Sequence, residues 1–512
     1  MPEPVQSVSD APWRGATVRV AATPGAAFCE HGGMTQAAPQ GTPQAESVSP
    51  VRTGSRVVII GGGPGGYEAA TVASRMGADV WLVERRGMGG SAVLTDVVPS
   101  KTLIATSEWT AQTESAGELG IRTGAVGVDM AMVNTRLRLL AATQSSDIRS
   151  ALAQTGVHLL DGSARLLPGP TEHGRRRVLV VSEPGGAERE LEAEIVLLAT
   201  GARPRELPDA IPDGERILNW TQLYDLDEVP DHLVVVGSGV TGAEFAGAFL
   251  TLGSRVTLVS SRDRVLPGED ADAAEIVEEV FRRRGMRIER RSRAAGAVNT
   301  GEGVEVTLTD GRVVRGTHCL MAVGAVPNTE GLGLPEAGVE LTASGHVRVD
   351  RVSRTTAFRV YAAGDCTGVL PLASVAAQQG RIAMWHALGD TLEPLDTSAI
   401  AQAVFTSPEV ANVGLSEAAA SRAGREVRVA QLPLARNPRA KMQGVSDGFV
   451  KIIASEAGVV LGGVVVGPHA SDLVFPLTLA VRQRMTVDEL SAAPTVYPSI
   501  SGSIAEVARM LH

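Results

Sequence analysis

The chain has 512 residues, a formal net charge of −10 and 57 glycines. This length exceeds what one hydrophobic core supports, so we expect three or four domains. The acidic balance argues against a nucleic-acid surface, which needs clustered Lys and Arg. No apolar run approaches the roughly 18 residues of a membrane-spanning helix, and the most apolar stretch, GVVLGGVVVG at 458–467, is short and Val-rich and predicts a buried strand.

The cysteines and histidines show no ligand spacing. The three cysteines, Cys29, Cys319 and Cys366, lie far apart without a CxxC pair, and the nine histidines include no HExxH-like pair. We therefore predict no disulfide framework and no metal site, and a reducing cytoplasm as the compartment.

Residues 1–54 differ from the remainder. They are rich in Ala, Pro, Gly, Ser, Thr and Gln and lack apolar periodicity. A cationic start followed by an apolar run is absent, so we expect no signal peptide. The composition predicts a disordered N-terminal extension, with a true start at Met34 as the alternative.

A first glycine-rich turn follows the strand-like run RVVII at 56–60. Gly61, Gly63 and Gly66 form GxGxxG, where the glycines serve a tight turn, backbone approach to a pyrophosphate and helix–strand packing. The following helix would point its N-terminal N–H groups at the phosphates. Glu84 closes the next strand, where a carboxylate accepts both hydroxyls of an adenosine ribose.

The segment GGSAVLTDVVPSK at 89–101 carries small, mostly apolar side chains between two glycines and a Pro-Ser-Lys. It contains no thiol. Its Lys101 is either a residue of the site or an ordinary exposed lysine.

A second glycine-rich turn has the same context. Gly237, Gly239 and Gly242 follow the run LVVV at 233–236 and precede a second helix and strand. One GxGxxG is weak support, but two in strand–turn–helix–strand context predict two dinucleotide sites. Such a pair suggests electron transfer between a tightly held flavin and a diffusing nicotinamide.

The two turns differ at the ribose position. Ser260 stands where the first copy has Glu84, and a serine does not repel a 2′-phosphate. Arg262 and Arg264 follow and could pair with that phosphate, although a solvated loop is equally compatible with them. We predict that NADPH is tolerated or preferred.

Four more segments follow in order: LLATGARPR (197–205), LMAVGAVPN (320–328), VYAAGDCTG (360–368) and FTSPEVANVGLSE (405–417). Together with the glycine turns and Pro-Ser-Lys, they resemble the pyridine nucleotide–disulfide oxidoreductase family, home of dihydrolipoamide dehydrogenase and glutathione reductase. The resemblance spans residues 55–512. It implies an α/β fold with two Rossmann-like dinucleotide-binding domains and a C-terminal α+β dimerisation domain.

The resemblance also implies domain limits and a homodimer. The FAD-binding domain would comprise residues 55–215 and 339–395, the NAD(P)-binding domain 216–338, and the dimerisation domain 396–512.

Carried over by position, the resemblance implies the site residues. Lys101 would lie by the flavin N5 and pair with Glu244, where a cation stabilises the anionic reduced flavin. Asp365 would accept from the ribityl chain. The cofactor-binding residues would be Gly61, Gly63, Gly66, Glu84, Lys101, Thr200, Gly201, Asp365, Gly237, Gly239, Gly242, Ser260, Arg262 and Gly324.

The thiol chemistry of the family is missing. Disulfide-reducing members carry two cysteines five residues apart, where this chain has Ala92 and Val97. Their C-terminal His-Pro-Thr-x-x-Glu motif corresponds here to YPSISG, with Tyr497 and Gly502 in place of the histidine and glutamate. A tyrosine with an ordinary pKa near 10 is a poor base at neutral pH. Both losses exclude lipoamide and glutathione chemistry.

We therefore predict an NAD(P)H dehydrogenase (quinone). NAD(P)H would reduce FAD, which would reduce a quinone-like small molecule directly, as in the cysteine-free quinone reductases that the segment at 89–101 resembles. A soluble transhydrogenase or NAD(P)H oxidase is the alternative, and a silent flavoprotein acting as a structural or regulatory dimer is a second. Cys366 is expected to be structural. Tyr497 could bond a quinone oxygen or pack at the dimer interface.

Overall fold

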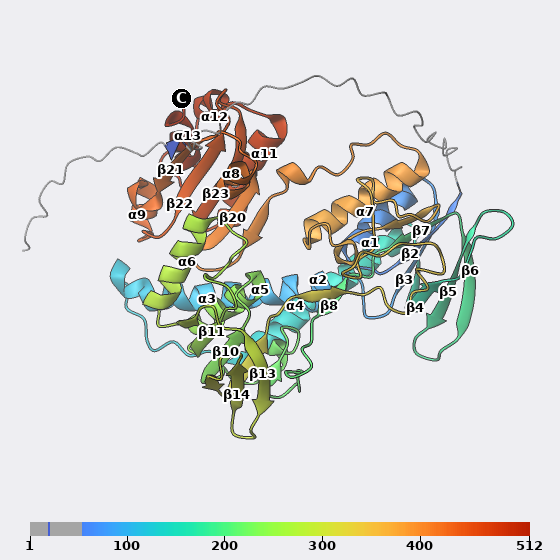
Figure 1. Cartoon of the computed structure of the whole chain (residues 1–512), viewed down its shortest axis with the longest axis horizontal. Helices are drawn as coiled ribbons and strands as arrows, with labels where there is room; N and C mark the ends of the chain where they lie inside the picture. Colours follow the sequence, from blue (N-terminus) through green and yellow to red (C-terminus); the bar gives the residue numbers. More distant parts are fainter. Residues whose placement is uncertain (1–18, 21–53) are drawn as a thin grey trace, which may run out of the picture. The chain divides into compact units, whose positions relative to one another are not determined.

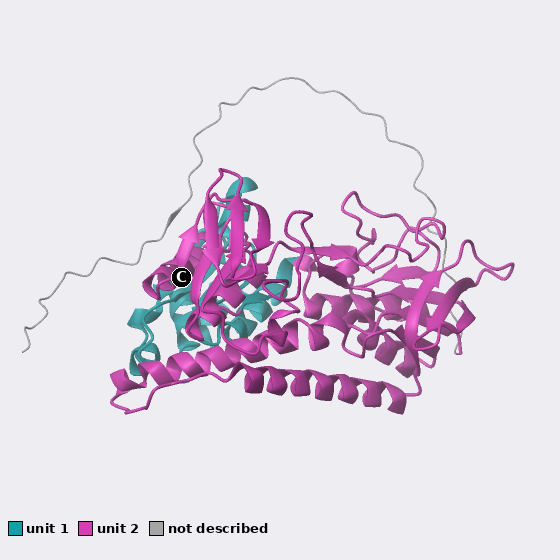
Figure 2. Cartoon of the chain, turned by 90° about the horizontal axis from the view of Figure 1, so that it is seen from below, with its two compact units in different colours: residues 1–27, 398–404, 408–512 teal, residues 28–397, 405–407 magenta. Residues whose placement is uncertain are grey.

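The computed structural model describes residues 19–20 and 54–512. The predicted disordered extension over residues 1–54 lies outside the described residues except at 19, 20 and 54. The chain divides into two compact units (Figure 2): the large unit, residues 28–397 and 405–407, and the C-terminal unit, residues 1–27, 398–404 and 408–512.

A seven-stranded sheet forms the first part of the large unit, in the order β18-β7-β2-β3-β4-β5-β6 (Figure 1). It is parallel from β18 to β4 and antiparallel from β4 to β6. The strands are β2 (Arg56–Ile60), β3 (Asp79–Glu84), β4 (His158–Leu166), β5 (Arg176–Ser182), β6 (Glu188–Ala193), β7 (Ile195–Leu198) and β18 (Val360–Ala362).

Helices α1 (Pro64–Arg75) and α7 (Ala373–Leu388) pack together against this sheet. Side chains of β2 alternate between two cores, as the strand period of two requires: Val57 and Ile59 join the core that contains α1 and α7, and Val58 and Ile60 join the other. The helices approach closely where a Cβ on Gly380 would collide with the Gly65 carbonyl. The other helices of this part are α2 (Gly90–Leu94), α3 (Val97–Ser115) and α4 (Met130–Gln154).

A second, five-stranded sheet is parallel throughout, in the order β12-β11-β10-β16-β9. Its elements are β9 (Ile217–Leu218), β10 (His232–Val236), α5 (Val240–Thr251), β11 (Arg255–Val259), α6 (Ala271–Arg283), β12 (Arg287–Glu289) and β16 (His318–Met321). An antiparallel meander, β13 (Ala294–Asn299), β14 (Val304–Leu308) and β15 (Val313–Gly316), precedes β16. The parallel five-stranded sheet and the mixed seven-stranded sheet, with their helices, confirm the predicted α/β class.

A two-stranded antiparallel ribbon is formed by the segments that follow one strand of each sheet. Strand β8 (Ala202–Pro204) follows β7, strand β17 (Ala325–Pro327) follows β16, and the two pair antiparallel. Two short 3-10 helices, η2 (Leu223–Asp225) and η3 (Asp365–Thr367), complete the parts of this unit that bear on the site.

The C-terminal unit contains an antiparallel six-stranded sheet in the order β1-β21-β22-β23-β20-β19. Its strands are β1 (Arg19–Val20), β19 (Gln402–Val404), β20 (Glu409–Gly414), β21 (Arg428–Pro433), β22 (Phe449–Ala454) and β23 (Val460–Gly467). Its helices are α8 (Glu417–Arg422), α9 (Pro438–Met442), α10 (Ala470–Leu473), α11 (Phe475–Gln483), α12 (Val487–Ala492) and α13 (Gly502–Arg509). The apolar stretch at 458–467 is β23, buried almost throughout, as predicted.

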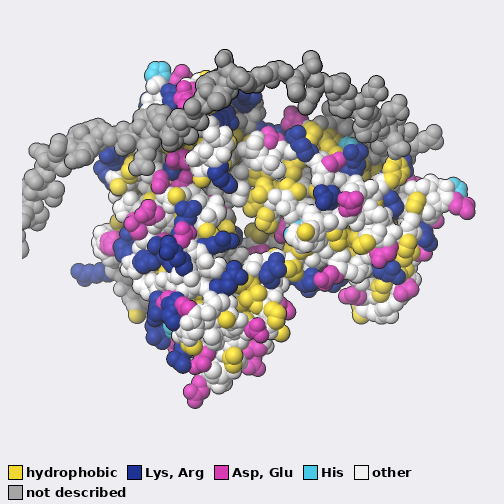
Figure 3. All heavy atoms as spheres, viewed as in Figure 1, with side chains coloured by type: hydrophobic (Ala, Val, Ile, Leu, Met, Phe, Trp, Pro, Cys, Tyr) yellow, Lys and Arg dark blue, Asp and Glu magenta, His cyan; other side chains and the backbone are white. Residues whose placement is uncertain are grey.

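Acidic and basic side chains are interspersed on the face drawn in Figure 3. Among residues 54–512, no helix combines the length and the apolar character that crossing a bilayer requires. The cytoplasmic location stays a prediction.

Candidate active site

In the first glycine turn, two of the three glycines have no space for a side chain, and the third does. Gly61 has φ +108° and a Cβ there would collide with the Ala199 carbonyl, while a Cβ on Gly66 would collide with the Gly61 carbonyl. Around Gly63, the nearest atom to a Cβ is the Gly89 carbonyl oxygen at 4.0 Å. The outer glycines are therefore required by packing, and the middle one leaves room for a ligand.

The second glycine turn repeats this arrangement. A Cβ on Gly237 would collide with the Ala322 carbonyl and one on Gly242 with the Gly237 carbonyl, but a Cβ on Gly239 would meet nothing within 4 Å. Gly63 and Gly239 precede α1 and α5, and neither helix start receives a side-chain cap. The backbone N–H groups at the starts of these helices, beginning at Gly65 in α1 because Pro64 has none and at Val240 in α5, can therefore bind a pyrophosphate.

A cavity of about 510 Å³ opens at the carboxyl ends of β2, β3 and β7. Glu84 lines one part of it, and its carboxylate accepts hydrogen bonds from the Gly62 and Arg86 amides, both at 2.7 Å. These two bonds fix the carboxylate while leaving acceptor capacity for a ribose.

Asp365 lines another part of the same cavity. Among the described residues, no group donates a hydrogen bond to its carboxylate, and burial raises its pKa. An unpartnered carboxylate in a partly desolvated place is costly, and the hydroxyls of a ribityl chain are suitable donors. The open position at Gly63 and the unpartnered Asp365 both fit FAD, which Gly61, Gly63, Glu84 and Asp365 would hold.

Thr200 and Gly201 also line the cavity, and Gly324 does not. The Thr200 hydroxyl donates to the Asn328 carbonyl at 2.7 Å, and the Asn328 side chain donates back to the Thr200 carbonyl at 2.9 Å. The Thr200 side chain therefore holds the end of the β8–β17 ribbon. Gly201 and Gly324 have φ of +68° and +92°, which favours glycine at both turns.

Lys101 and Glu244 lie on α3 and α5, and the lysine Nζ donates to Glu244 Oε2 at 2.7 Å. The Glu244 side chain is 3% exposed, and its second oxygen accepts the backbone N–H of Phe405 at 2.9 Å. The Lys101 ammonium lies 4.9 Å from the centre of the Phe405 ring. The lysine is thus held by a buried carboxylate and an aromatic face. Phe405 was not among the predicted site residues, although it lies at the start of the FTSPEV segment.

Ala92 and Val97 both line the cavity, and Val97 is 38% exposed. Asp96, between them, lines it too. Burial raises the pKa of Asp96 to about 6, with Lys101 lowering it and Glu244 and Asp365 raising it. Asp96 was not among the predicted site residues, and its only signal in the sequence was a carboxylate within a mostly apolar segment.

At the carboxyl end of β11, Ser260 is fully buried and its hydroxyl bonds to Ser238 at 2.7 Å. The Ser260 hydroxyl is already hydrogen-bonded within the protein. Ser260 would therefore affect nucleotide binding only because it puts no carboxylate at this position. Arg264 donates to the carbonyls of Pro267 and Glu269. Arg262 is exposed, and its side chain has no hydrogen-bond or ion-pair partner in the described part of the chain.

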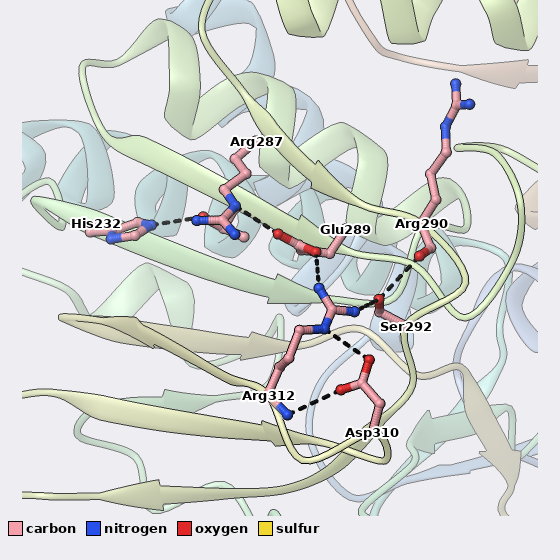
Figure 4. Close-up of polar contacts among 8 residues, drawn as sticks. His232, Arg287, Glu289, Arg290, Ser292, Asp310 and Arg312 are labelled. Carbon is pink, nitrogen blue, oxygen red and sulfur yellow. Dashed lines mark hydrogen bonds and ion pairs between the residues drawn. The ribbon is translucent and has the colours of Figure 1, made fainter.

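Other arginines near this strand end are neutralised by carboxylates (Figure 4). Glu289 pairs with Arg287 and Arg312, both at 2.6 Å, and Arg312 also pairs with Asp310 at 2.8 Å. The side chain of the exposed Arg262 therefore differs from these arginines in having no carboxylate partner among the described residues, and the exposed Arg291 donates its backbone N–H to the Arg262 carbonyl.

Cys366 is completely buried, and burial raises the pKa of its thiol to about 11. Its Sγ contacts the carbonyls of Ala363 and Leu198 at 3.3 and 3.7 Å, which suits the expected structural role. In the C-terminal unit, Tyr497 is 80% exposed and Gly502 begins α13. No group of three or more potential metal ligands occurs in residues 54–512.

Comparison with known families decides the relationship. Residues 55–380 match the pyridine nucleotide-disulphide oxidoreductase family, and residues 400–508 match the dimerisation domain of the same family. The chain belongs to this family. It is an oxidoreductase that uses FAD and NAD(P)H.

The chain is similar both to a quinone-reducing member of the family and to dihydrolipoyl dehydrogenases. It is 50% identical to an NAD(P)H dehydrogenase (quinone) of Mycobacterium tuberculosis over 463 residues, 89% of this chain and 94% of that protein. It is 34% identical to the dihydrolipoyl dehydrogenase of Chlorobaculum parvum over 457 residues, 88% of this chain and 96% of that protein. The crystal structure of LpdA from M. tuberculosis superposes with a TM-score of 0.86 at 50% identity, covering 90% of this chain and all of that one.

Proposed function

We propose that this protein is an NAD(P)H dehydrogenase that reduces a quinone directly, without a redox disulfide. The observation that carries the proposal is the combination of the Lys101–Glu244 ion pair, which is not part of the cavity lining, with Ala92 and Val97, which line the cavity. The residues that would serve flavin reduction are present, and the positions where the family resemblance implies thiols hold Ala92 and Val97. The printed name of the 50% identical M. tuberculosis relative supports the same acceptor class.

Bound FAD supplies the hydride acceptor and, once reduced, the electrons for the second substrate. Lys101 would place a positive charge beside the ring system, where negative charge develops on reduction. Glu244 balances that charge before reduction, and the Phe405 amide keeps the second carboxylate oxygen hydrogen-bonded.

The segment at 89–101 would form the acceptor side. Ala92 and Val97 present small apolar surfaces to the cavity, and neither forms a covalent intermediate. A flat, apolar two-electron acceptor fits such a wall, and quinones are the chemical class with this shape and electron count.

NADPH is the nicotinamide that the second glycine turn favours. Ser260 removes the carboxylate that would repel a 2′-phosphate, and the exposed, unpaired Arg262 supplies a cation near it. The match to the family dimerisation domain supports a homodimer, in which Tyr497 would lie at or near the acceptor site of the partner.

Anaerobic stopped-flow spectroscopy tests the proposal. Mixing with NADPH should bleach the flavin rapidly, and a benzoquinone or naphthoquinone should restore its colour. Reoxidation by thio-NADP but not by quinones would instead indicate a transhydrogenase, rapid reoxidation by dioxygen alone an oxidase, and failure to bleach a silent flavoprotein. Turnover of lipoamide would refute the absence of disulfide chemistry.

A further inference from the structure

Asp96 lies between helices α2 and α3, and its side chain makes no capping hydrogen bond. Helix α2 ends at Leu94 and α3 begins at Val97. The Asp96 backbone is held at both ends, because its N–H donates to the Ser91 carbonyl and its carbonyl accepts from the Ser100 amide, both at 2.8 Å. Its carboxyl makes no capping bond to α3 although it occupies the N-cap position. The carboxyl is therefore free to act on whatever occupies the cavity that it lines.

Four titratable groups from four elements interact electrostatically with this carboxyl. They are Lys101 of α3, Glu244 of α5, Asp365 of η3 and Tyr224 of η2. Burial and the two acidic neighbours raise the Asp96 pKa, and Lys101 opposes them, with a net value of about 6. Both the acid and the carboxylate are therefore populated near neutral pH, which is the condition for efficient proton transfer.

Reduction of a quinone by NAD(P)H needs a proton that the nicotinamide does not supply. The balanced reaction is NAD(P)H + H⁺ + quinone → NAD(P)⁺ + hydroquinone. One hydrogen of the product comes with the electron pair, and the other must arrive as H⁺. An acceptor seated against Ala92 and Val97 has an apolar wall on that side, so a protein acid nearby would deliver the proton faster than bulk water.

We propose that Asp96 donates this proton to the quinone oxygen. This inference rests on the proposed quinone reductase function. The carboxyl O–H bond breaks as the hydroquinone O–H bond forms, and the carboxylate then takes a proton from solvent. Tyr224 is the other acid at hand, but burial and the charges of Asp96 and Glu244 raise its phenol pKa, so it is a poor donor at neutral pH.

Separate half-reactions of the FAD-loaded protein test the assignment with Asp96→Asn, which keeps the size of the side chain and removes the acid. Bleaching by NADPH should stay within about 3-fold of wild type. Reoxidation by ferricyanide, which takes electrons without protons, should be no slower. Reoxidation by benzoquinone should slow by about 100-fold, and Asp96→Glu should recover part of that loss. The exposed Asp227→Asn serves as the matched control and should behave as wild type in all three steps.

A titration without turnover provides an independent readout. The visible spectrum of the oxidised flavin should shift with a midpoint near pH 6 in wild type and Asp227→Asn, and the shift should be lost in Asp96→Asn. In the kinetic experiment, wild-type reoxidation by benzoquinone should fall as pH rises through this midpoint because the acid form is lost, whereas the slow Asp96→Asn rate should be independent of pH.

Two outcomes overturn the inference in different ways. If Asp96→Asn reoxidises with benzoquinone as fast as wild type, Asp96 is not the donor, and the quinone reductase proposal is unaffected. If wild type itself is bleached by NADPH but reoxidised by no quinone, the proposed function fails and the role of Asp96 fails with it.

Discussion

Lys101 and Glu244 are separated by 143 residues along the chain and form a 2.7 Å ion pair in which the glutamate is 3% and the lysine 27% exposed. The unequal burial matters because the lysine ammonium stays partly accessible, whereas the glutamate carboxylate is buried and held by a second hydrogen bond. Removing one partner of such a pair leaves the other without compensation.

Replacing Lys101 with Met should slow flavin reduction by NADPH by about 100-fold, because the cation that stabilises developing negative charge is lost. FAD should remain bound, since the glycine turn, Glu84 and Asp365 are untouched. Rapid-mixing absorbance of the purified variant measures the rate. The exposed Lys441→Met is the control, and an unchanged reduction rate in Lys101→Met would discard the role.

Replacing Arg262 with Ala should raise the KM for NADPH by about 10-fold, equivalent to roughly 1.4 kcal/mol. The KM for NADH should change little, because only NADPH carries the 2′-phosphate. Steady-state kinetics with both nucleotides provides the measurement. Arg287→Ala is the matched control because Glu289 already neutralises Arg287, and equal effects on both nucleotides would contradict the assignment.

The middle and last glycines of the second turn should respond differently to alanine. A Cβ on Gly242 collides with the Gly237 carbonyl, so Gly242→Ala should cost about 1–3 kcal/mol and lower the Tm by several degrees. Gly239 has φ −73° and an open environment, so Gly239→Ala should fold normally and weaken NAD(P)H binding. Thermal unfolding and nucleotide titration separate the two effects, and a reversed pattern would refute this view of the turn.

Cys366 should prove chemically inert. With its thiol pKa raised to about 11, only about one molecule in a thousand carries the thiolate at pH 8. Native protein should therefore leave the peptide containing Cys366 unlabelled by iodoacetamide, as judged by mass spectrometry. Cys366→Ser should keep turnover within a few-fold, because a hydroxyl can donate to the same carbonyls. Loss of quinone reduction in that variant would assign the thiol a redox role.

Much of the fold could be predicted because its signals are local. Each glycine turn lies within about 30 consecutive residues of strand, helix and strand, and Gly61 and Gly237 both show the positive φ that such turns need. The division into FAD, NAD(P) and dimerisation domains stays a prediction. Asp96 lies within the segment at 89–101 but was missed, because nothing in its sequence context shows that it lines the cavity. Tyr224, whose phenol interacts with Asp96, comes from a segment without a motif.

The amino-acid sequence by itself determined which chemical groups this protein has and lacks: two GxGxxG turns, a lysine after Pro-Ser, and no thiol at positions 92 and 97. Only the tertiary structure decided which of those groups can act. Arg262 and Arg264 are equivalent in sequence, but one is unpaired and the other is held by backbone carbonyls. Asp96 resembles any surface aspartate in the sequence, but in the folded chain burial and the charges of Glu244 on α5 and Asp365 on η3 raise its pKa. The physical reason is that turn geometry depends on neighbouring residues, whereas burial and charge compensation depend on residues brought together from more than a hundred positions away.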